Sequence, residues 1–93
     1  MIKSFRDNEA EKLWRGGRSK KLPVSIQGRA LRKLAMLDAA PALADLTIPP
    51  SNYLELLKGN RSGQHSIRIN KQWRLCFVWI DGNAHDVEIT DYH

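Results

Sequence analysis

The residues of this sequence with the clearest chemical potential are the cations of its second half. Residues 56–80 contain five Lys and Arg side chains and no Asp or Glu, whereas residues 81–93 contain four acids and no Lys or Arg. Guanidinium and ammonium groups bind phosphate oxygens through charge-assisted hydrogen bonds. The pattern therefore indicates an anionic ligand, and the candidate cations are Lys58, Arg61, Arg68, Lys71 and Arg74.

Arg74 is the sharpest candidate because it lies between Trp73 and Leu75 in the most apolar run of the sequence. A charged side chain in an apolar strand must find a partner or open onto a cleft. Two interpretations stay open. Arg74 lies at the floor of a phosphate-binding groove, or it forms a buried ion pair, for which Asp91 is the candidate partner.

Asp91, Tyr92 and His93 follow the last expected strand and offer a carboxylate, a phenol and an imidazole. Asp91 shares the alternation of Val87 and Ile89, so we expect it to point towards the covered side of the sheet. Together with the cations, these groups are the parts that a metal-independent ribonuclease needs. Its reaction requires a base for the ribose 2′-hydroxyl, cations for the phosphate and an acid for the departing 5′-oxygen.

Other standard constellations are missing from the sequence. It contains no cysteine pair, no His-x-x-x-His and no carboxylate cluster with metal-ligand spacing, so we expect no metal and no cofactor. Residues 58–63 lack the glycine pattern of a phosphate-binding loop. Cys76 falls inside an apolar strand and is expected to be a buried small side chain. Strand alternation predicts His85 on the opposite face from Asp86 and Glu88.

Length and composition limit the classes of protein that fit. A chain of 93 residues with 42% hydrophobic and 27% charged residues is expected to be one globular domain spanning residues 1–93. Its longest apolar run, residues 75–80, is far shorter than the roughly 20 residues of a membrane span. The single cysteine favours a reducing, cytoplasmic location. The net charge of +5 and the sequence pI of about 9.7 favour a nucleic-acid partner.

Two helices are expected in the first half of the chain, and they should pack against the sheet that carries the candidate residues. Residues 2–6 are β-compatible, and Asp7 is a candidate N-cap for a helix that ends at Gly16-Gly17. Residues 23–40 form the stronger helix, because their apolar side chains recur on one face, and Pro41 marks its end. Residues 41–54 look irregular.

The hydrophobic period changes to that of strands in the second half. We expect strands over residues 66–70 and 73–80 and a third that includes Val87 and Ile89, with a turn at residues 81–83. Both faces of residues 73–80 are mostly apolar, so this strand should be central and at least partly covered on both sides. The fold class is α+β: a small antiparallel sheet of about four strands, with residues 2–6 as the first, and two N-terminal helices packed on one side.

Five segments together resemble the HigB family of bacterial toxins, which belongs to the RelE superfamily of toxin–antitoxin toxins (plasmid maintenance killer proteins). The similar segments cover nearly the whole chain and are residues 2–5, 32–40, 49–61, 66–77 and 91–93. One position departs from the family pattern. Some relatives carry a histidine two residues after the position of Tyr53, where this chain has Glu55.

The resemblance implies a RelE-like fold and a ribosome-dependent endoribonuclease that cuts mRNA in the ribosomal A site and stops translation. It implies neutralisation by HigA, a helix-turn-helix antitoxin that also represses the operon, so operator DNA would be bound only through the antitoxin. Carried onto this sequence, the implied RNA-binding residues are Arg61, Arg68 and Lys71. The implied catalytic residues are Lys58, Arg74, Asp91, Tyr92 and His93.

Three alternatives use the same basic surface. A non-catalytic RNA- or DNA-binding module would not need Tyr92 and His93. An antitoxin-like repressor would need a recognition helix, and the sequence predicts only two helices. A free-standing ribonuclease would cut naked RNA, whereas the family resemblance implies little cutting without ribosomes.

Overall fold

Both predicted helices are present in the computed structural model, which describes residues 1–91. Helix α1 spans Asn8–Trp14, and the Asp7 carboxylate accepts a hydrogen bond of 2.7 Å from the Ala10 amide, as expected of an N-cap. Gly16, with φ of +90°, turns the chain away after this helix. Helix α2 spans Val24–Ala39 and buries one stripe of apolar side chains, namely Ile26, Ala30, Leu34 and Leu37.

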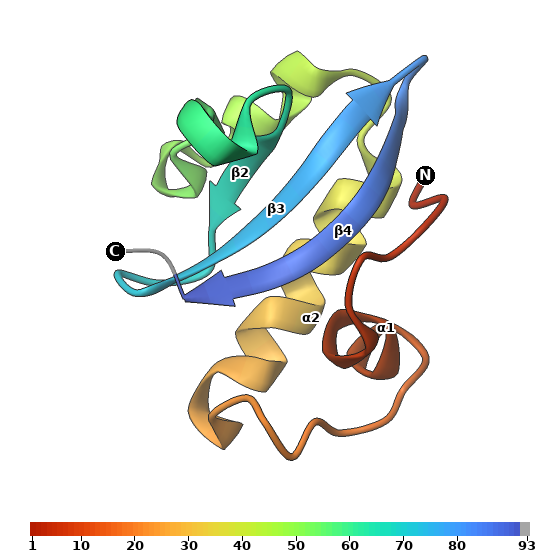
Figure 1. The fold of residues 1–93 in the computed structure, drawn as a ribbon, viewed down its shortest axis with the longest axis vertical. Helices are drawn as coiled ribbons and strands as arrows, with labels where there is room; N and C mark the ends of the chain where they lie inside the picture. The colour runs from red at the N-terminus through yellow and green to blue at the C-terminus, as the bar shows by residue number, and fades with distance from the viewer. Residues whose placement is uncertain (92–93) are drawn as a thin grey trace.

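Four strands form one antiparallel sheet in the order β1-β2-β3-β4 (Figure 1). They are β1 (Glu55–Leu56), β2 (His65–Arg68), β3 (Trp73–Ile80) and β4 (Asn83–Asp91). Short 3-10 helices connect α2 to the sheet and β1 to β2, and they are η1 (Leu43–Thr47), η2 (Pro50–Asn52) and η3 (Gly59–Arg61). The predicted α+β class and the predicted bounds of the central strand are confirmed.

The source of the fourth strand was predicted incorrectly. Residues 2–6 make only two isolated parallel bridges to β4, Ile2 with Ala84 and Phe5 with Val87, and the fourth strand is the short β1. The left-handed backbone of Asp86, with φ of +52°, lies between these two contact points and interrupts a regular ladder. The N-terminal segment therefore runs beside β4 without becoming a full member of the sheet (Figure 1).

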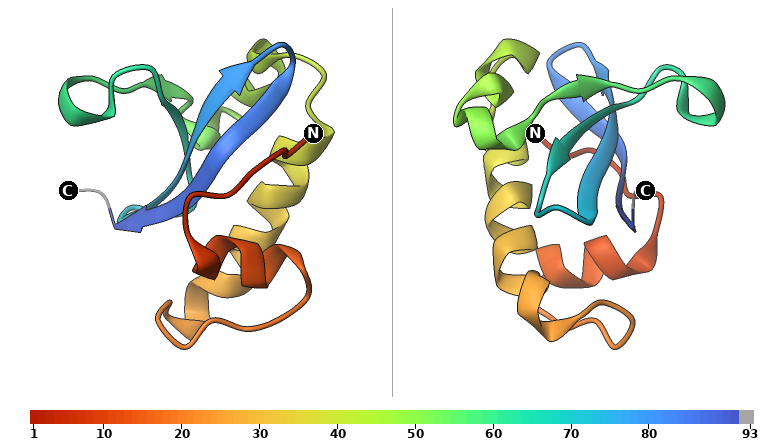
Figure 2. Two further views of the ribbon diagram at one scale, coloured as in Figure 1. Left: turned by 45° about the vertical axis from the view of Figure 1, so that its right-hand side comes forward. Right: turned by 90° about the vertical axis from the view of Figure 1, so that its left-hand side faces the viewer.

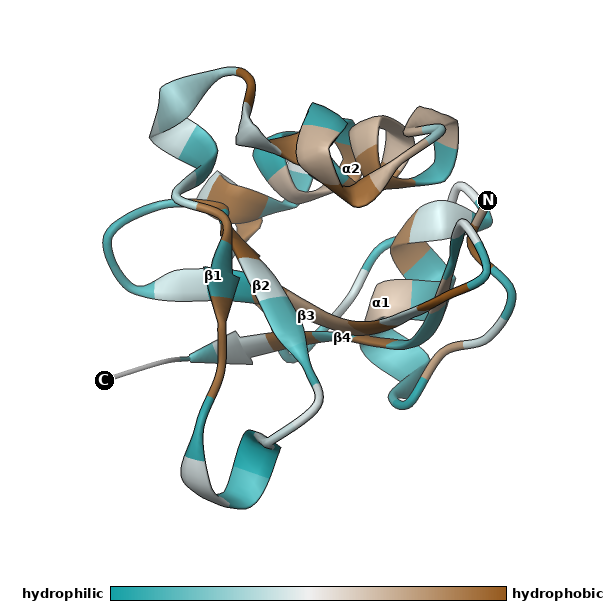
Figure 3. Ribbon diagram, turned by 90° about the horizontal axis from the view of Figure 1, so that it is seen from above, coloured by the Kyte–Doolittle hydropathy of each residue, from teal (hydrophilic) through white to brown (hydrophobic). Residues whose placement is uncertain are grey.

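The core lies between the helices and one face of the sheet, and both helices cover the same face (Figure 3). Leu75 and Phe77 of β3 and Ile67 of β2 are fully buried there against α2. The loop that contains η3 projects beyond the sheet on the side away from α2 (Figure 2). The prediction that β3 is central and at least partly covered on both sides is confirmed, because Cys76 is fully buried on the face away from the helices, whereas Ile80 at the end of the strand is 48% exposed.

A bulge in β4 changes which side chains share a face. Cys76 pairs with Glu88 and Val78 pairs with His85, so an extra residue of β4 is accommodated between the two pairs. Side chains that are directly opposite share a face, and therefore His85 and Glu88 lie on the same side of the sheet. The prediction that His85 and Glu88 lie on opposite faces was therefore wrong, because the bulge interrupts the regular alternation of β4. No helix of residues 1–91 has the length and apolar character that a membrane crossing requires.

Candidate active site

The face of the sheet that turns away from the helices carries two rows of polar side chains. The strand register places Glu55, Ser66, Cys76 and Glu88 in one row across all four strands. The next row holds Arg68 opposite Arg74, followed by Thr90. Two arginines directly opposite each other repel, so this face must compensate their charge.

Arg74 is compensated by groups from β1 and β2. Its Nη2 lies 3.1 Å from the Glu55 Oε1, and its Nη1 donates a hydrogen bond of 2.7 Å to the Ser66 hydroxyl. A longer hydrogen bond of 3.5 Å goes from Nη1 to the Tyr53 carbonyl. The Arg74 side chain is 11% exposed and that of Glu55 is 48% exposed, so the arginine is held inside while its carboxylate partner opens to solvent.

The expected pairing of Arg74 with Asp91 was wrong. Asp91 is opposite Trp73 in the register, so its Cβ lies on the face of Trp73, and Arg74, the next residue along β3, points the other way. The Asp91 carboxylate is exposed and accepts a hydrogen bond of 2.9 Å from the Gln72 amide. The face of the sheet on which Asp91 lies was predicted correctly. At this end of β4, however, that face is exposed to solvent rather than covered by the helices.

Arg68 is compensated by an aromatic ring. Its guanidinium lies 4.1 Å from the centre of the Tyr53 ring, a cation–π arrangement. Tyr53 has φ of +45°, a left-handed conformation that is unusual for a bulky residue. This residue therefore contributes its ring to Arg68 and its carbonyl to Arg74, and links the two arginines.

The loop between β1 and β2 brings a third arginine to the face. Arg61 of η3 forms an ion pair with Glu88 of β4 and donates a hydrogen bond of 3.2 Å to Gln64. The two charged side chains are 28% and 15% exposed, so most of this pair is removed from solvent. Lys58 precedes η3 in the same loop and is exposed.

Cys76 lies on the same face of the sheet, in the row of Ser66 and Glu88. It is fully buried, and burial raises the pKa of its thiol. A thiol with a raised pKa is a poor nucleophile. The prediction of a buried small side chain is confirmed. Within residues 1–91 no group of three or more His, Cys, Asp or Glu side chains is arranged to hold a metal ion.

A model of the RelE-like HigB toxins of type II toxin–antitoxin systems matches residues 3–93. The chain belongs to the HigB-like toxin family. It is 47% identical over 85 residues to Toxin HigB-1 of Vibrio cholerae, with 90% of each chain covered. It is also 32% identical over 93 residues to Endoribonuclease HigB of Proteus vulgaris, with both chains covered completely.

Solved structures agree on the fold of this HigB-like chain. The YoeB–YefM complex from Staphylococcus aureus contains a chain with a TM-score of 0.57 and 18% identity, covering 100% of this chain and 98% of that one. YafQ from E. coli gives a TM-score of 0.56 at 13% identity, covering 98% and 93%. The predicted RelE-like fold and the predicted family are confirmed.

The structure brings together part of the residue set that the HigB resemblance implied. Arg74 and Arg68 are neighbours on the sheet face, and Arg61 approaches the same face through Glu88. Lys71, in the turn between β2 and β3, lines a separate pocket together with Arg68. Tyr92 and His93 lie outside the described residues.

Sequence reasoning missed two features of the site in this HigB-like chain. The first is the ion pair between Glu55 and Arg74, which joins residues far apart in the sequence and has no local signal. The second is a set of cations on α2, Arg29, Arg32 and Lys33, which line the same pocket as Lys71. Their spacing of three and four residues, which places them side by side on a helix, is the signal that could have found them.

Proposed function

We propose that this chain is an endoribonuclease that cuts mRNA bound in the A site of the ribosome and thereby stops translation in the cytoplasm. Membership of the HigB-like family and the resemblance to a relative named Endoribonuclease HigB support the class of reaction. The observation that carries the proposal for this chain is the juxtaposition of Arg74, Arg68 and Glu55 on the sheet face that the helices leave uncovered.

Arg74 is the group that stabilises the reacting phosphate. Its guanidinium is held in one orientation by Ser66 and Glu55, so it needs little reorganisation to receive an anion. Fixed cations aimed at developing charge are among the largest contributions to catalysis. Arg68, in the facing position of β2, adds a second positive charge for the phosphate oxygens.

Glu55 is the proposed general base. Its carboxylate is half exposed and lies 3.1 Å from the guanidinium, so a phosphate bound to Arg74 also lies close to Glu55. When phosphate oxygens take up the Arg74 hydrogen bonds, the carboxylate is released to accept the proton of the ribose 2′-hydroxyl. The 2′-oxygen then bonds to phosphorus and the bond to the 5′-oxygen breaks. The products are a 2′,3′-cyclic phosphate and a 5′-hydroxyl.

The departing 5′-oxygen requires a proton from an acid. We assign this role to His93, since histidine is the side chain best suited to transfer a proton near neutral pH. Tyr92 is proposed to stack on a base of the message, and Lys58 and Asp91 complete the set implied by the family resemblance. No step of this scheme calls for a metal or a cofactor. Removing Tyr92 and His93 should abolish toxicity while leaving the melting temperature unchanged.

An antitoxin is the proposed protein partner. The family is defined by type II toxin–antitoxin systems, and the solved YoeB–YefM structure is a complex of a similarly folded chain with a second protein. The HigB resemblance points to a HigA-like helix-turn-helix protein, through which the toxin would reach operator DNA. Co-expression with such a protein should restore growth.

The decisive experiment incubates the purified protein with one message, with and without programmed ribosomes. Cutting that requires ribosomes, ends in a 2′,3′-cyclic phosphate and persists in a chelator supports the proposal. Cutting of naked RNA at the same rate indicates a free-standing ribonuclease instead. Binding of RNA without cutting under either condition indicates a non-catalytic binding module.

A further inference from the structure

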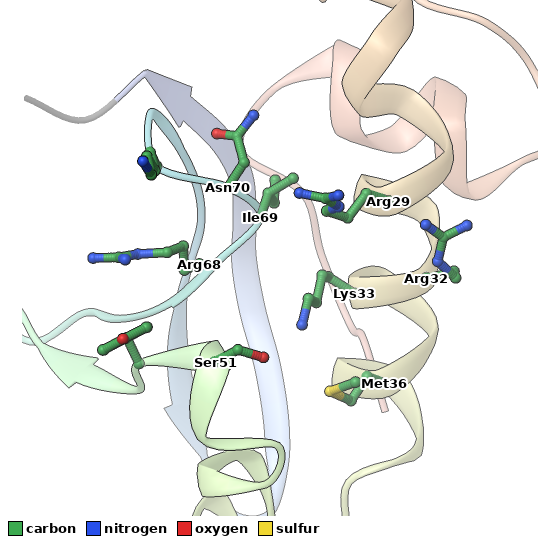
Figure 4. A pocket seen from close by; sticks show the side chains of 10 residues that line it. Arg29, Arg32, Lys33, Met36, Ser51, Arg68, Ile69 and Asn70 are labelled. Carbon is green, nitrogen blue, oxygen red and sulfur yellow. The ribbon is translucent and has the colours of Figure 1, made fainter.

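A second basic region lies beside the sheet face, in a pocket between α2 and the turn that joins β2 to β3. The pocket has a volume of about 510 Å³. In Figure 4, Arg29 extends from α2 towards Ile69 on the other wall, and Lys33 extends towards the segment that holds Ser51. We call it the α2 pocket, and its lining cations are Arg29, Arg32, Lys33, Arg68 and Lys71.

Within residues 1–91, no acidic side chain neutralises the positive charge of the α2 pocket. No acidic side chain lines it, and within residues 1–91 none of its five cations forms an ion pair. Ion pairs are formed elsewhere on the molecule, by Lys12, Arg15, Arg61 and Arg74. The accumulated charge therefore favours an anionic ligand.

Lys33 is built into the wall of the pocket rather than left on the surface. Its ammonium group donates a hydrogen bond of 2.5 Å to the Oδ1 of Asn52, which is fully buried. The Asn52 amide in turn donates to the Leu46 carbonyl at 3.0 Å. Partial burial, with Arg29 and Arg32 nearby, lowers the pKa of Lys33, as expected for an ammonium group placed among other cations.

The α2 pocket is continuous with the proposed active site. Arg68 lines the pocket and faces Arg74 across the β2–β3 ladder. Tyr53 also lines the pocket, and its carbonyl accepts the long hydrogen bond from Arg74. A ligand with phosphates at regular intervals could therefore contact Arg74 and the α2 pocket at the same time. An isolated anion could not use this continuity.

We propose that the α2 pocket holds the backbone of an RNA strand next to the phosphate that lies at Arg74, and so anchors the strand beside the point of cutting. The identity of the strand rests on the proposed function. The pocket itself is a site for phosphodiester groups, and the role of its three α2 cations is affinity rather than chemistry, because Arg29, Arg32 and Lys33 lie outside the set that would contact the reacting atoms.

The test measures binding of an uncleavable single-stranded RNA, in which 2′-O-methyl groups replace the attacking hydroxyls. The probe is about 12 nucleotides long, within the usual range of single-strand sites. The variant Arg29→Gln/Arg32→Gln/Lys33→Gln should bind it about tenfold more weakly at low salt. The slope of log affinity against log salt should fall by up to about 2, since each phosphate contact contributes about 0.7.

A matched control changes net charge equally at a different surface. Lys3, Lys20 and Lys21 are exposed and do not line the pocket, so Lys3→Gln/Lys20→Gln/Lys21→Gln should leave binding nearly unchanged. Because Lys33 also holds Asn52, the double variant Arg29→Gln/Arg32→Gln keeps that hydrogen bond and should give about two thirds of the change in slope. Melting curves check that all variants are folded.

Two further probes separate this proposal from its competitors. A dinucleotide spans a single phosphodiester, so its binding should not respond to the pocket variants. Polyglutamate tests an acidic protein segment as the occupant. The proposal is overturned if the control variant weakens RNA binding as much, or if the pocket variants weaken polyglutamate binding and leave RNA binding intact. None of these readouts depends on cutting, so they stand even if the ribosome experiment fails.

Discussion

The uncovered face of the sheet and the α2 pocket are both rich in arginine, but they treat its charge in opposite ways. On the sheet face, Arg74 is paired with Glu55 and Arg61 with Glu88, and Arg68 stacks on Tyr53. In the α2 pocket, Arg29, Arg32 and Lys33 line one cavity without any acidic side chain in the lining. The two regions share Arg68 and Tyr53, so one surface passes from compensated to uncompensated charge.

The two regions suit different roles: the paired arginines of the sheet face can position a reacting group, and the cations of the α2 pocket can attract a polyanion. A paired arginine is held in one orientation, which suits a group that must meet a transition state. Cations without an acidic partner keep their long-range field, which suits capture of a polyanion. Substitutions on the sheet face should therefore change the rate of cutting or the stability, whereas those in the α2 pocket should change affinity and its salt dependence.

The largest effect is expected from Arg74→Ala, which removes the central cation of the sheet face. Cutting on programmed ribosomes should slow by about 10²–10³-fold, because the charge of the transition state loses its main partner. Ribosome binding should stay largely intact, and melting should change little, since the abandoned Glu55 is 48% exposed. A folded Arg74→Ala protein with full activity would remove the sheet face from the mechanism.

Glu55→Gln tests whether pairing or proton transfer is the role of the carboxylate. Glutamine can still accept the hydrogen bond from Arg74 but cannot take up a proton, so a general base predicts a loss of about 10²-fold in kcat. If Glu55 only orients Arg74, Glu55→Gln should stay active and Glu55→Ala should not. Single-turnover rates for the two variants distinguish the roles.

Arg61→Ala measures the structural value of a compensated pair. Glu88, 15% exposed, would lose its cation, and we expect the free energy of unfolding to fall by about 1.5–3 kcal/mol. Arg29→Ala in the α2 pocket should change it by no more than about 0.5 kcal/mol, because no partner is abandoned. Urea unfolding of both variants makes the comparison. If both variants lost the same free energy of unfolding, ion pairing would not distinguish the sheet face from the α2 pocket.

The smallest effect concerns His65, on the helix side of β2. Its Nδ1 is buried, has no hydrogen-bond partner among residues 1–91, and burial lowers the pKa of the ring below 6.5. The unfolded chain therefore binds a proton at a higher pH than the folded one, so stability should fall as pH drops below about 6.5. The slope contributed by this group cannot exceed about 1.4 kcal/mol per pH unit.

His65→Phe supplies the control for this pH dependence, because phenylalanine keeps the stacking on Phe77 and removes the titrating group. The variant should show a flatter dependence of unfolding free energy on pH between about 5 and 7. An unchanged slope would show that His65 is not the source of the acid sensitivity in this pH range. The Glu9 carboxyl, whose pKa is lowered by its hydrogen bond to Ser19, contributes to acid sensitivity only at lower pH.

Most of the fold could be predicted from the sequence because its signals are local. The stripe along residues 23–40, the Asp7 cap and the alternation of residues 73–80 each follow from backbone periodicity, and all three are confirmed. The wrong assignments each came from one irregular residue or a distant contact. The bulge at Asp86 moved His85 onto the face of Glu88, and residues 2–6 met β4 at two points only.

The sequence by itself determined which side chains were available, namely a basic, acid-free stretch, one arginine inside an apolar strand and three cations on the second helix. Only the tertiary structure decided which of them meet. Glu55, rather than Asp91, pairs with Arg74 because β1 adds to the edge of β2 in a register that puts the two on one face. Arg68 and α2 enclose one pocket because the helix packs across the sheet. Periodicity is a property of neighbouring residues, whereas a change of one residue in pairing moves a side chain to the opposite face.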